Sequence, residues 1–265
     1  METARDSDFR LDGKVIVMTG AAGILGSSAV MRFLDAGARV CALDLSSQVL
    51  ERLGPDHDCL LKLAVDVTDK TSLRIAQEQL HERWGTADVL FNNAATKSEN
   101  FFAPFEDFPL EDWNEVMGVN LTGAMLCCQV FGAPMAQLGR GAVVNTLSIY
   151  GIVAPDQRIY EGSEYLGRPI NTPAIYSASK AGLWGLTKYL ASYWGPRGVR
   201  VNAVTPGGVF SGQNQIFVHN YSQRVPLNRM ASSRDIVHAM TFLASDASAY
   251  VNGHNLVIDG GWTVW

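Results

Sequence analysis

The sequence predicts a single doubly wound α/β domain, and three observations carry that prediction. Short apolar segments alternate with longer segments of helical periodicity along all 265 residues, which is typical of βα units around a parallel sheet. The short segments are continuously apolar, as expected of strands that helices cover on both faces. A glycine-rich turn joins the first of these strands to the first helix.

This alternation predicts seven strands in one parallel sheet. They are expected at residues 15–19, 40–44, 60–66, 89–92, 142–147, 199–204 and 255–258. Helices are expected at residues 26–36, 70–84, 110–138, 174–194 and 233–244. The last helix begins with Ser232 and Asp235 at the spacing of a capping box.

Four segments fall outside the alternation. Residues 1–12 are predicted as an N-terminal tail, 97–109 as a loop, 152–173 as an inserted loop on the substrate side, and 211–226 as a short substrate loop. Long loops in compact domains are commonly functional. All 265 residues are therefore expected to form one domain whose loops shape its site.

Composition excludes several classes of function. With 47% hydrophobic and 18% charged residues the chain can bury a large core, and its net charge of −5 argues against nucleic-acid or anionic-membrane partners. Its apolar runs are shorter than the roughly 20 residues of a membrane span, and the polar N-terminus is unlike a signal peptide, which predicts a cytoplasmic protein. The 4 cysteines and 5 histidines lack metal-ligand spacing, so no metal is expected.

The turn after the first strand carries three glycines at positions 20, 23 and 26. Glycine lets backbone N–H groups approach a pyrophosphate, and the N-terminus of the following helix attracts anions. A turn of this kind between a strand and a helix indicates a Rossmann-type dinucleotide site. The residues expected to contact the cofactor here are Gly20, Gly23, Ile24, Leu25 and Gly26.

Two acidic residues end the second and third strands. Asp44 lies 24 residues after Gly20, where a carboxylate accepts hydrogen bonds from the adenosine ribose. Because it would repel a 2′-phosphate and no Arg or Lys occupies positions 45–47, NAD(H) is predicted over NADP(H). Asp66 and Val67 are expected beside the adenine, although a strand-end cap is an alternative role for Asp66.

A tyrosine and a lysine share one helical face at Tyr176 and Lys180. A neighbouring cation lowers a phenol pKa from its usual value of about 10, so that the phenol can exchange a proton with an alcohol or carbonyl oxygen. Ser148 ends the fifth strand and Asn120 lies in the long helix. Both are expected to face the crevice above the carboxyl ends of the strands.

Taken in order, these elements resemble the short-chain dehydrogenase/reductase family over residues 13–262, together with Asn93-Ala94, Pro206-Gly207 and the closing 259–261. The resemblance implies that Tyr176 is the general acid/base, and that Lys180 lowers the pKa of Tyr176 and holds the nicotinamide ribose. It also implies that Ser148 polarises the substrate oxygen and that Asn120 supports a proton-relay water. It also implies further cofactor contacts, at Asn93, Ala94, Pro206, Gly207, Val209 and Ser211.

The chain departs from the family pattern in three places. Its glycine spacing is more typical of the extended, sugar-nucleotide branch, and Ser148 and Tyr176 are 28 residues apart, about twice the classical separation. Ser211 replaces a common threonine. We keep the classical architecture, because the chain has no room for a C-terminal substrate domain, and interpret residues 152–173 as an enlarged loop.

The loop is rich in hydrogen-bonding side chains, which favours a polar, sugar-like or anionic substrate over an apolar one. Tyr150 is expected to contact the substrate, and Lys97, Arg158 or Arg168 is expected to pair with a negative charge on the substrate. Packing of a subunit interface is the alternative role for this loop. The family resemblance implies a homo-oligomer, a dimer or tetramer, with the aromatic C-terminus, residues 262–265, as an interface anchor.

Three functions are consistent with these residues. The first is an NAD-dependent dehydrogenase or carbonyl reductase that interconverts a secondary alcohol and a ketone. The second is an epimerase or dehydratase that recycles its hydride internally, and the third is a non-catalytic nucleotide-binding protein. Net formation of NADH separates the first from the others.

Overall fold

The computed structural model describes residues 7–55, 57–165 and 167–265. A seven-stranded, wholly parallel sheet forms its centre, in the order β3-β2-β1-β4-β5-β8-β9. The strands are β1 (Val15–Thr19), β2 (Arg39–Asp44), β3 (Leu60–Ala64), β4 (Val89–Asn92), β5 (Gly141–Thr146), β8 (Val199–Pro206) and β9 (Asn255–Ile258). The prediction of seven strands is confirmed, with bounds that agree to within two residues.

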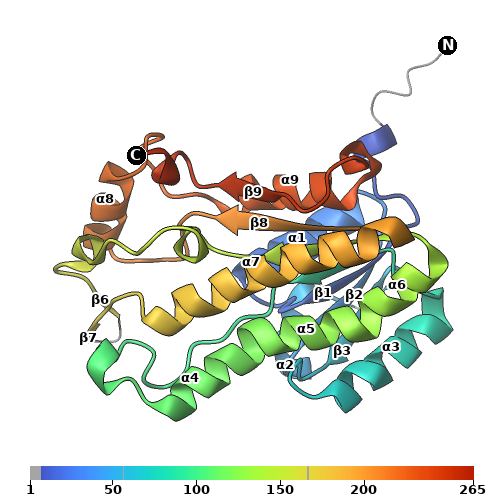
Figure 1. Cartoon of the computed structure of the whole chain (residues 1–265), viewed down its shortest axis with the longest axis horizontal. Coiled ribbons are helices and arrows are strands. Elements are labelled where there is room, and N and C mark those ends of the chain that lie inside the picture. The colour runs from blue at the N-terminus through green and yellow to red at the C-terminus, as the bar shows by residue number, and fades with distance from the viewer. Residues whose placement is uncertain (1–6, 56, 166) are drawn as a thin grey trace.

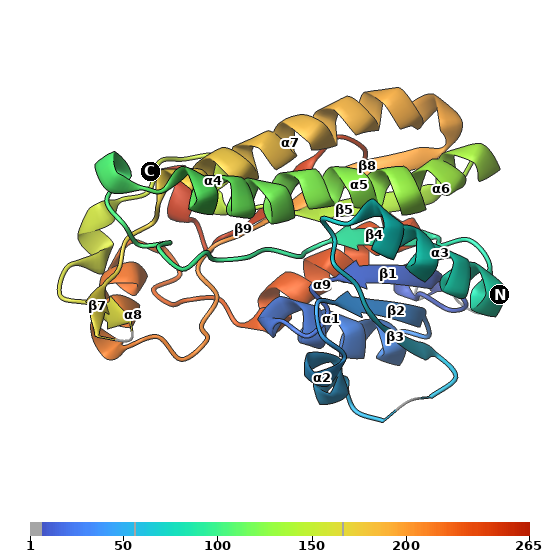
Figure 2. The same ribbon diagram turned by 90° about the horizontal axis from the view of Figure 1, so that it is seen from below.

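Helices cover both faces of the sheet (Figure 2). On one face lie α1 (Ile24–Asp35) and α9 (Ser233–Ala244). On the other lie α3 (Lys70–Trp84), α4 (Leu110–Met117), α5 (Ala124–Cys127), α6 (Ala133–Leu138) and α7 (Ala174–Trp194), while the short α2 (Ser47–Leu50) follows β2. From β1 the chain first builds β2 and β3 on one side of that strand and then continues with β4 on its other side. The strand order therefore reverses between β1 and β4, which opens a crevice at their carboxyl ends.

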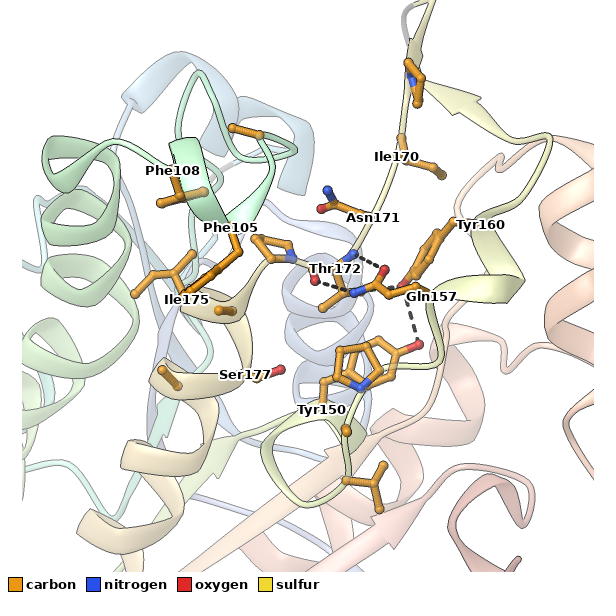
Figure 3. A pocket seen from close by; sticks show the side chains of 18 of the residues that line it. Phe105, Phe108, Tyr150, Gln157, Tyr160, Ile170, Asn171, Thr172, Ile175 and Ser177 are labelled. Atoms are coloured by element: carbon orange, nitrogen blue, oxygen red, sulfur yellow. Dashed lines mark hydrogen bonds between the residues drawn. The ribbon is translucent and has the colours of Figure 1, made fainter.

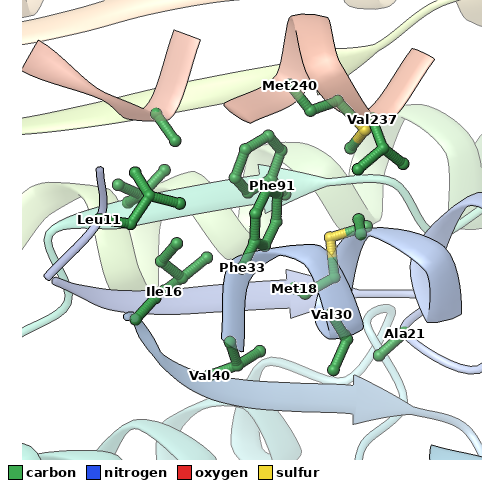
Figure 4. Packing of buried hydrophobic residues seen from close by; sticks show 14 of the residues in the cluster. Leu11, Ile16, Met18, Ala21, Val30, Phe33, Val40, Phe91, Val237 and Met240 are labelled. Carbon is green, nitrogen blue, oxygen red and sulfur yellow. The ribbon is translucent and has the colours of Figure 1, made fainter. Parts of the chain in front are cut away.

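The core between the sheet, α1 and α9 fixes the first βα unit (Figure 4). Phe33 of α1 stacks on Phe91 of β4 with ring centroids 4.8 Å apart. Leu11 is fully buried in this core, and its amide donates to the Ala36 carbonyl at 3.0 Å. The predicted tail of residues 1–12 is therefore part of the fold at Leu11, whereas residues 1–6 lie outside the described part of the chain.

The stretch from α4 to α6 is one continuous helical rod, as predicted, but two π-helical segments interrupt it, at Gly118–Gly123 and Cys128–Gly132. By length and composition alone, Leu110–Leu138 is apolar enough to cross a membrane, a feature that the reading of short apolar runs did not identify. In the structure half of its most apolar window is buried. It lies along α3 and α7 on the sheet (Figure 1), as a core helix does.

Two small elements lie together beyond the carboxyl ends of the strands (Figure 1). The antiparallel hairpin of β6 (Glu164–Tyr165) and β7 (Arg168–Pro169) lies in the predicted loop 152–173. The helix α8 (Gln215–Gln223) corrects the expectation that residues 211–226 form a loop. Asn214 caps this helix by accepting a hydrogen bond from the Phe217 amide at 2.9 Å. The capping residue is a local signal for a helix, although the helical periodicity of the segment is weak.

The C-terminus packs inward. Trp262 is 4% exposed and stacks on Tyr221 of α8 at 4.5 Å, whereas Trp265 is 73% exposed. The expectation that the whole aromatic C-terminus forms an interface anchor is wrong for Trp262, because its ring fills space inside its own chain. The predicted capping box of α9 is confirmed, since Ser232 and Asp235 exchange hydrogen bonds.

Candidate active site

A cleft of about 1580 Å³ runs across the carboxyl ends of the strands. Its walls are the turn after β1, the ends of β2 to β5 and β8, the N-terminal part of α7 and the segments around α8. Most of the predicted site residues line this cleft: Gly20, Gly23, Ile24, Leu25, Asp44, Asp66, Val67, Asn93, Ala94, Lys97, Ser148, Tyr150, Tyr176, Lys180, Pro206, Gly207, Val209 and Ser211. Gly26, Asn120 and Arg158 do not line it, and the side chain of Arg168 lies outside the described part of the chain.

The glycine turn brings backbone close to backbone. Gly20 has a φ of +62°, and a Cβ there would lie 2.9 Å from the Ala94 Cα. A Cβ at Gly26 would lie 2.0 Å from the Gly20 carbonyl oxygen, so Gly26 acts by packing the start of α1 against the turn. No side chain caps α1 at Gly23. Its first amides are therefore available to an anion in the cleft, which fits a dinucleotide pyrophosphate.

The end of β4 fixes this turn in place. The Asn93 side-chain amide donates to the carbonyls of Thr19 and Gly20, both at 3.2 Å. The Thr19 hydroxyl in turn accepts from the backbone amides of Asn93 and Ala94, at 3.0 and 3.1 Å. Asn93 thus holds the shape of the cofactor turn in addition to lining the cleft, and Thr19 is a supporting residue that sequence reasoning missed.

Asp44 lies at the end of β2, beside the same turn. One carboxylate oxygen accepts from the Ala22 amide at 2.9 Å and the other from the Leu45 amide at 2.8 Å. Asp66 instead accepts from both the amide and the hydroxyl of Thr68, which is the strand-end cap considered as its alternative role. Arg52 also lines this end of the cleft, eight positions after Asp44. It lies beyond positions 45–47, where the absence of Arg and Lys had led to the prediction of NAD(H).

The chemical centre lies between β5 and α7. Ser148 is 7% exposed directly after β5, and Tyr176 and Lys180 are one helical turn apart on α7. The Lys180 ammonium donates to the Thr146 carbonyl at 2.8 Å and lies 5.9 Å from the centroid of the Tyr176 ring. The Ser148 hydroxyl lies close enough to the Tyr176 phenol to lower the pKa of that phenol. The structure therefore brings serine, tyrosine and lysine together as predicted.

Burial dominates the titration of this centre. It raises the pKa of the Tyr176 phenol, while the hydrogen bond with Ser148 acts in the opposite direction. Burial also lowers the pKa of Lys180 to about 8. The expectation that the lysine depresses the pKa of the phenol is not met in this geometry, because desolvation outweighs the opposing hydrogen bond.

Asn120 has a supporting position. It is 1% exposed in the first π-helical segment, behind a cleft wall to which Gly118 and Val119 contribute. Its Oδ1 accepts from the Thr96 amide at 3.0 Å, and its Nδ2 donates to the Ser179 hydroxyl at 3.2 Å. The side chain thus connects the loop after β4 to α7.

The substrate side of the cleft faces the chemical centre. Lys97 lies 5.8 Å from the ring of Phe101 and 5.3 Å from that of Phe102, and burial lowers its pKa. Arg158 is exposed outside the cleft, where it pairs with Asp156 at 2.8 Å. This geometry argues against Arg158 as a substrate ligand, because its guanidinium lies outside the cleft and is paired with that carboxylate.

Several residues that sequence reasoning did not single out complete the substrate side. Asn171, Thr172, Phe217 and Tyr221 line the cleft with Tyr150 and Tyr160. No motif marks them, since they come from the loop before α7 and from α8. A second cavity of about 1100 Å³ lies behind Asn171 and Thr172, with Phe105, Phe108 and Ile175 among its lining residues (Figure 3).

Comparison with known proteins agrees with this arrangement. A family model described as enoyl-(acyl carrier protein) reductase matches residues 20–263. D-Threitol dehydrogenase of Mycolicibacterium smegmatis is 37% identical over 99% of this chain and 98% of its own length. A short-chain dehydrogenase from Leptospira borgpetersenii with bound NAD+ has a TM-score of 0.87 and 36% identity, covering 99% of this chain and 97% of that one. A gluconate 5-dehydrogenase from Burkholderia cenocepacia, in complex with NADP and tartrate, has a TM-score of 0.84 and 28% identity, with 98% of each chain covered.

Proposed function

The chain belongs to the short-chain dehydrogenase/reductase family, and from that premise we propose that it oxidises a neutral polyol to a ketone with NAD⁺. Membership makes it a pyridine-nucleotide-dependent oxidoreductase that interconverts secondary alcohols and ketones. One observation carries the proposal. Ser148, Tyr176 and Lys180 line the same cleft as the glycine turn and Asp44, so reacting groups and dinucleotide contacts share one space.

The residues of the chemical centre have different roles in the proposed reaction. A nicotinamide ring bound in the cleft supplies the hydride acceptor. Ser148 holds the substrate oxygen by a hydrogen bond, and Tyr176 accepts the hydroxyl proton as the ketone forms. Lys180, one turn further along α7, would hold the nicotinamide ribose, and its positive charge would offset part of the desolvation that disfavours the Tyr176 phenolate. Asn120 acts as a positioning residue through Thr96 and Ser179.

Asp44 supports a preference for NAD⁺ over NADP⁺. Its carboxylate is oriented by the amides of Ala22 and Leu45 and would repel a 2′-phosphate. Arg52 lies at the same end of the cleft and is the group that could oppose this preference. We therefore expect Asp44→Asn to raise kcat/KM with NADP⁺ relative to NAD⁺, measured at saturating substrate.

The charges on the substrate side favour a neutral substrate. Lys97 lies over two phenyl rings, where desolvation lowers its pKa, and Glu164 lines the same cleft. Hydroxyls and amides, such as those of Tyr150 and Asn171, line this side as well, together with apolar side chains such as Phe217. The printed name of the threitol dehydrogenase, a relative that spans nearly this whole chain, supports a polyol of about four carbons.

The segment between Ser148 and Tyr176 gives this site its particular shape. We propose that residues 152–173 are an enlarged substrate loop, since they contribute Tyr160, Asn171 and Thr172 to the cleft. The assembly into a dimer or tetramer, a cytoplasmic location and activity as a carbonyl reductase stay predictions from the sequence.

The direct test is a substrate panel followed by absorbance of the reduced nucleotide. Purified protein is given NAD⁺ or NADP⁺ with threitol, glycerol, gluconate and butan-2-ol. We expect reduced nucleotide with the neutral polyols, at a kcat/KM at least tenfold higher with NAD⁺. Turnover of gluconate alone would show an anionic substrate, and a tightly held nucleotide without net NADH would indicate internal hydride recycling. Either result contradicts the proposal.

A further inference from the structure

Three hydroxyl groups meet on the substrate side of the cleft. The Tyr160 hydroxyl lies 3.4 Å from that of Tyr150 and is hydrogen-bonded to Thr172 Oγ1 (Figure 3). All three residues line the cleft that holds Ser148 and Tyr176. They also line the second cavity, so they form part of the wall between the two spaces.

The framework around these hydroxyls holds them in position. The Tyr160 ring stacks on Phe217 of α8, with centroids 5.4 Å apart. The Gln157 side chain bonds both backbone groups of Thr172, donating to its carbonyl at 3.0 Å and accepting from its amide at 3.3 Å. The Tyr150 amide donates to Ser148 Oγ at 3.2 Å. The hydroxyl cluster is thus connected directly to the chemical centre and is preorganised.

Within the described part of the chain, one hydrogen-bond acceptor beside the cluster has no partner. Asn171 donates through Nδ2 to the Phe102 carbonyl at 3.0 Å, but its buried Oδ1 accepts no hydrogen bond from any described residue. A buried polar atom left unpaired costs free energy, so a small rotation of the Asn171 side chain that lets Oδ1 accept from a ligand in the cleft would be favourable. A substrate hydroxyl is a donor of the required kind.

The cluster is neutral. Burial is the main cause that raises the pKa of both Tyr150 and Tyr160, so both phenols remain protonated donors near neutral pH. Tyr160 is also close enough to Tyr176 to raise the pKa of that phenol. The recognition chemistry available near the reacting centre is therefore hydrogen bonding to uncharged oxygen.

We propose that Tyr150, Tyr160, Asn171 and Thr172 form a subsite that binds a second hydroxyl of the substrate, next to the carbon that is oxidised. This inference rests on the proposed function and names the feature of the polyol that the enzyme selects. Tyr160 is the central residue, because its hydroxyl contacts both neighbouring hydroxyls. The enzyme then prefers vicinal diols to alcohols of the same length that lack the second hydroxyl.

The test compares Tyr160→Phe with the wild-type enzyme on butane-2,3-diol and butan-2-ol, with NAD⁺ as acceptor. The substitution keeps the ring that stacks on Phe217 and removes one hydroxyl. We expect kcat/KM for the diol to fall tenfold or more, as for the loss of a hydrogen bond in a buried site, and that for butan-2-ol to change less than twofold. Tyr193→Phe, at an exposed tyrosine of α7, should leave both unchanged.

Two further measurements keep the inference separate from the proposed function. Thr172→Val should reproduce the selective loss, and equal thermal midpoints would show that both variants are folded. If the wild-type enzyme turns over no alcohol, the proposed function fails, and diol binding in the presence of NADH, measured by calorimetry, then judges the subsite. Equal losses on both alcohols, or diol binding that Tyr160→Phe leaves unchanged, would overturn it.

Discussion

At the cofactor end of the cleft, backbone sets the geometry: a carbonyl of the glycine turn lies where a Cβ at Gly26 would be, and Asn93 bonds the carbonyls of Thr19 and Gly20. At the substrate end, side chains set it, through a column of rings from Tyr160 over Phe217 and Tyr221 to Trp262. The cofactor end therefore tolerates almost no added side chain, whereas the substrate end can change its specificity by exchange of rings and hydroxyls.

Lys180 stands at the boundary between the two ends, and its titration gives the largest expected effect. Its pKa is lowered by burial to about 8, from 10.5 in an unfolded chain. Between these values the unfolded state binds a proton that the folded state does not, so the free energy of unfolding rises with pH. The shift corresponds to about 3 kcal/mol.

The measurement is chemical denaturation of wild type and Lys180→Met from pH 7 to about 11, a window chosen to bracket the lysine titration. The difference between wild type and variant should move in favour of wild type by about 3 kcal/mol across this window. Groups that titrate in both proteins cancel in the difference. A difference that stays flat would show that Lys180 is not desolvated as the structure indicates.

Gly26→Ala sharpens the contrast at the cofactor end. The added Cβ would lie 2.0 Å from the Gly20 carbonyl oxygen, so the turn must shift at a cost of about 1–3 kcal/mol. NADH affinity should fall roughly tenfold to a hundredfold, measured by fluorescence titration. Gly185→Ala is the matched control, because that glycine of α7 has no atom within 4 Å of its added Cβ. Equal affinity in both variants would remove the packing role of Gly26.

The same contrast explains what the sequence could predict. The strands, the glycine turn, Asp44, Ser148, Tyr176 and Lys180 carry local signals: continuous apolar runs, a strand-turn-helix context and an i, i+4 pair. The loop composition marked Tyr160 as a hydrogen-bonding side chain, but no local signal predicted that it meets Thr172 beside Asn171, because this depends on how residues 152–173 fold back against α8. The spacing of Tyr176 and Lys180 could not predict the direction of the Tyr176 pKa shift either. Burial, which only the structure shows, raises this pKa more than the neighbouring groups lower it.

Arg158 illustrates the limit in the opposite direction. An arginine in a polar loop before Tyr176 suggested an anion-binding group, but its guanidinium lies outside the cleft and pairs with Asp156, which also pairs with Arg224 at 3.0 Å. A charge counted along the sequence is thus no measure of the charge available to a ligand. Asn214 likewise caps a helix in a segment, residues 211–226, that was predicted as a loop.

The central claim is that Tyr176 performs the proton transfer in a cleft whose cofactor end is built independently of it. The measurement is Tyr176→Phe, with NADH binding and polyol oxidation followed in the same preparation. We expect NADH affinity within about twofold of wild type, and a kcat lower by a factor of roughly 10² to 10⁴, the range for loss of a general acid/base. A variant that keeps a tenth or more of the activity would contradict the claim.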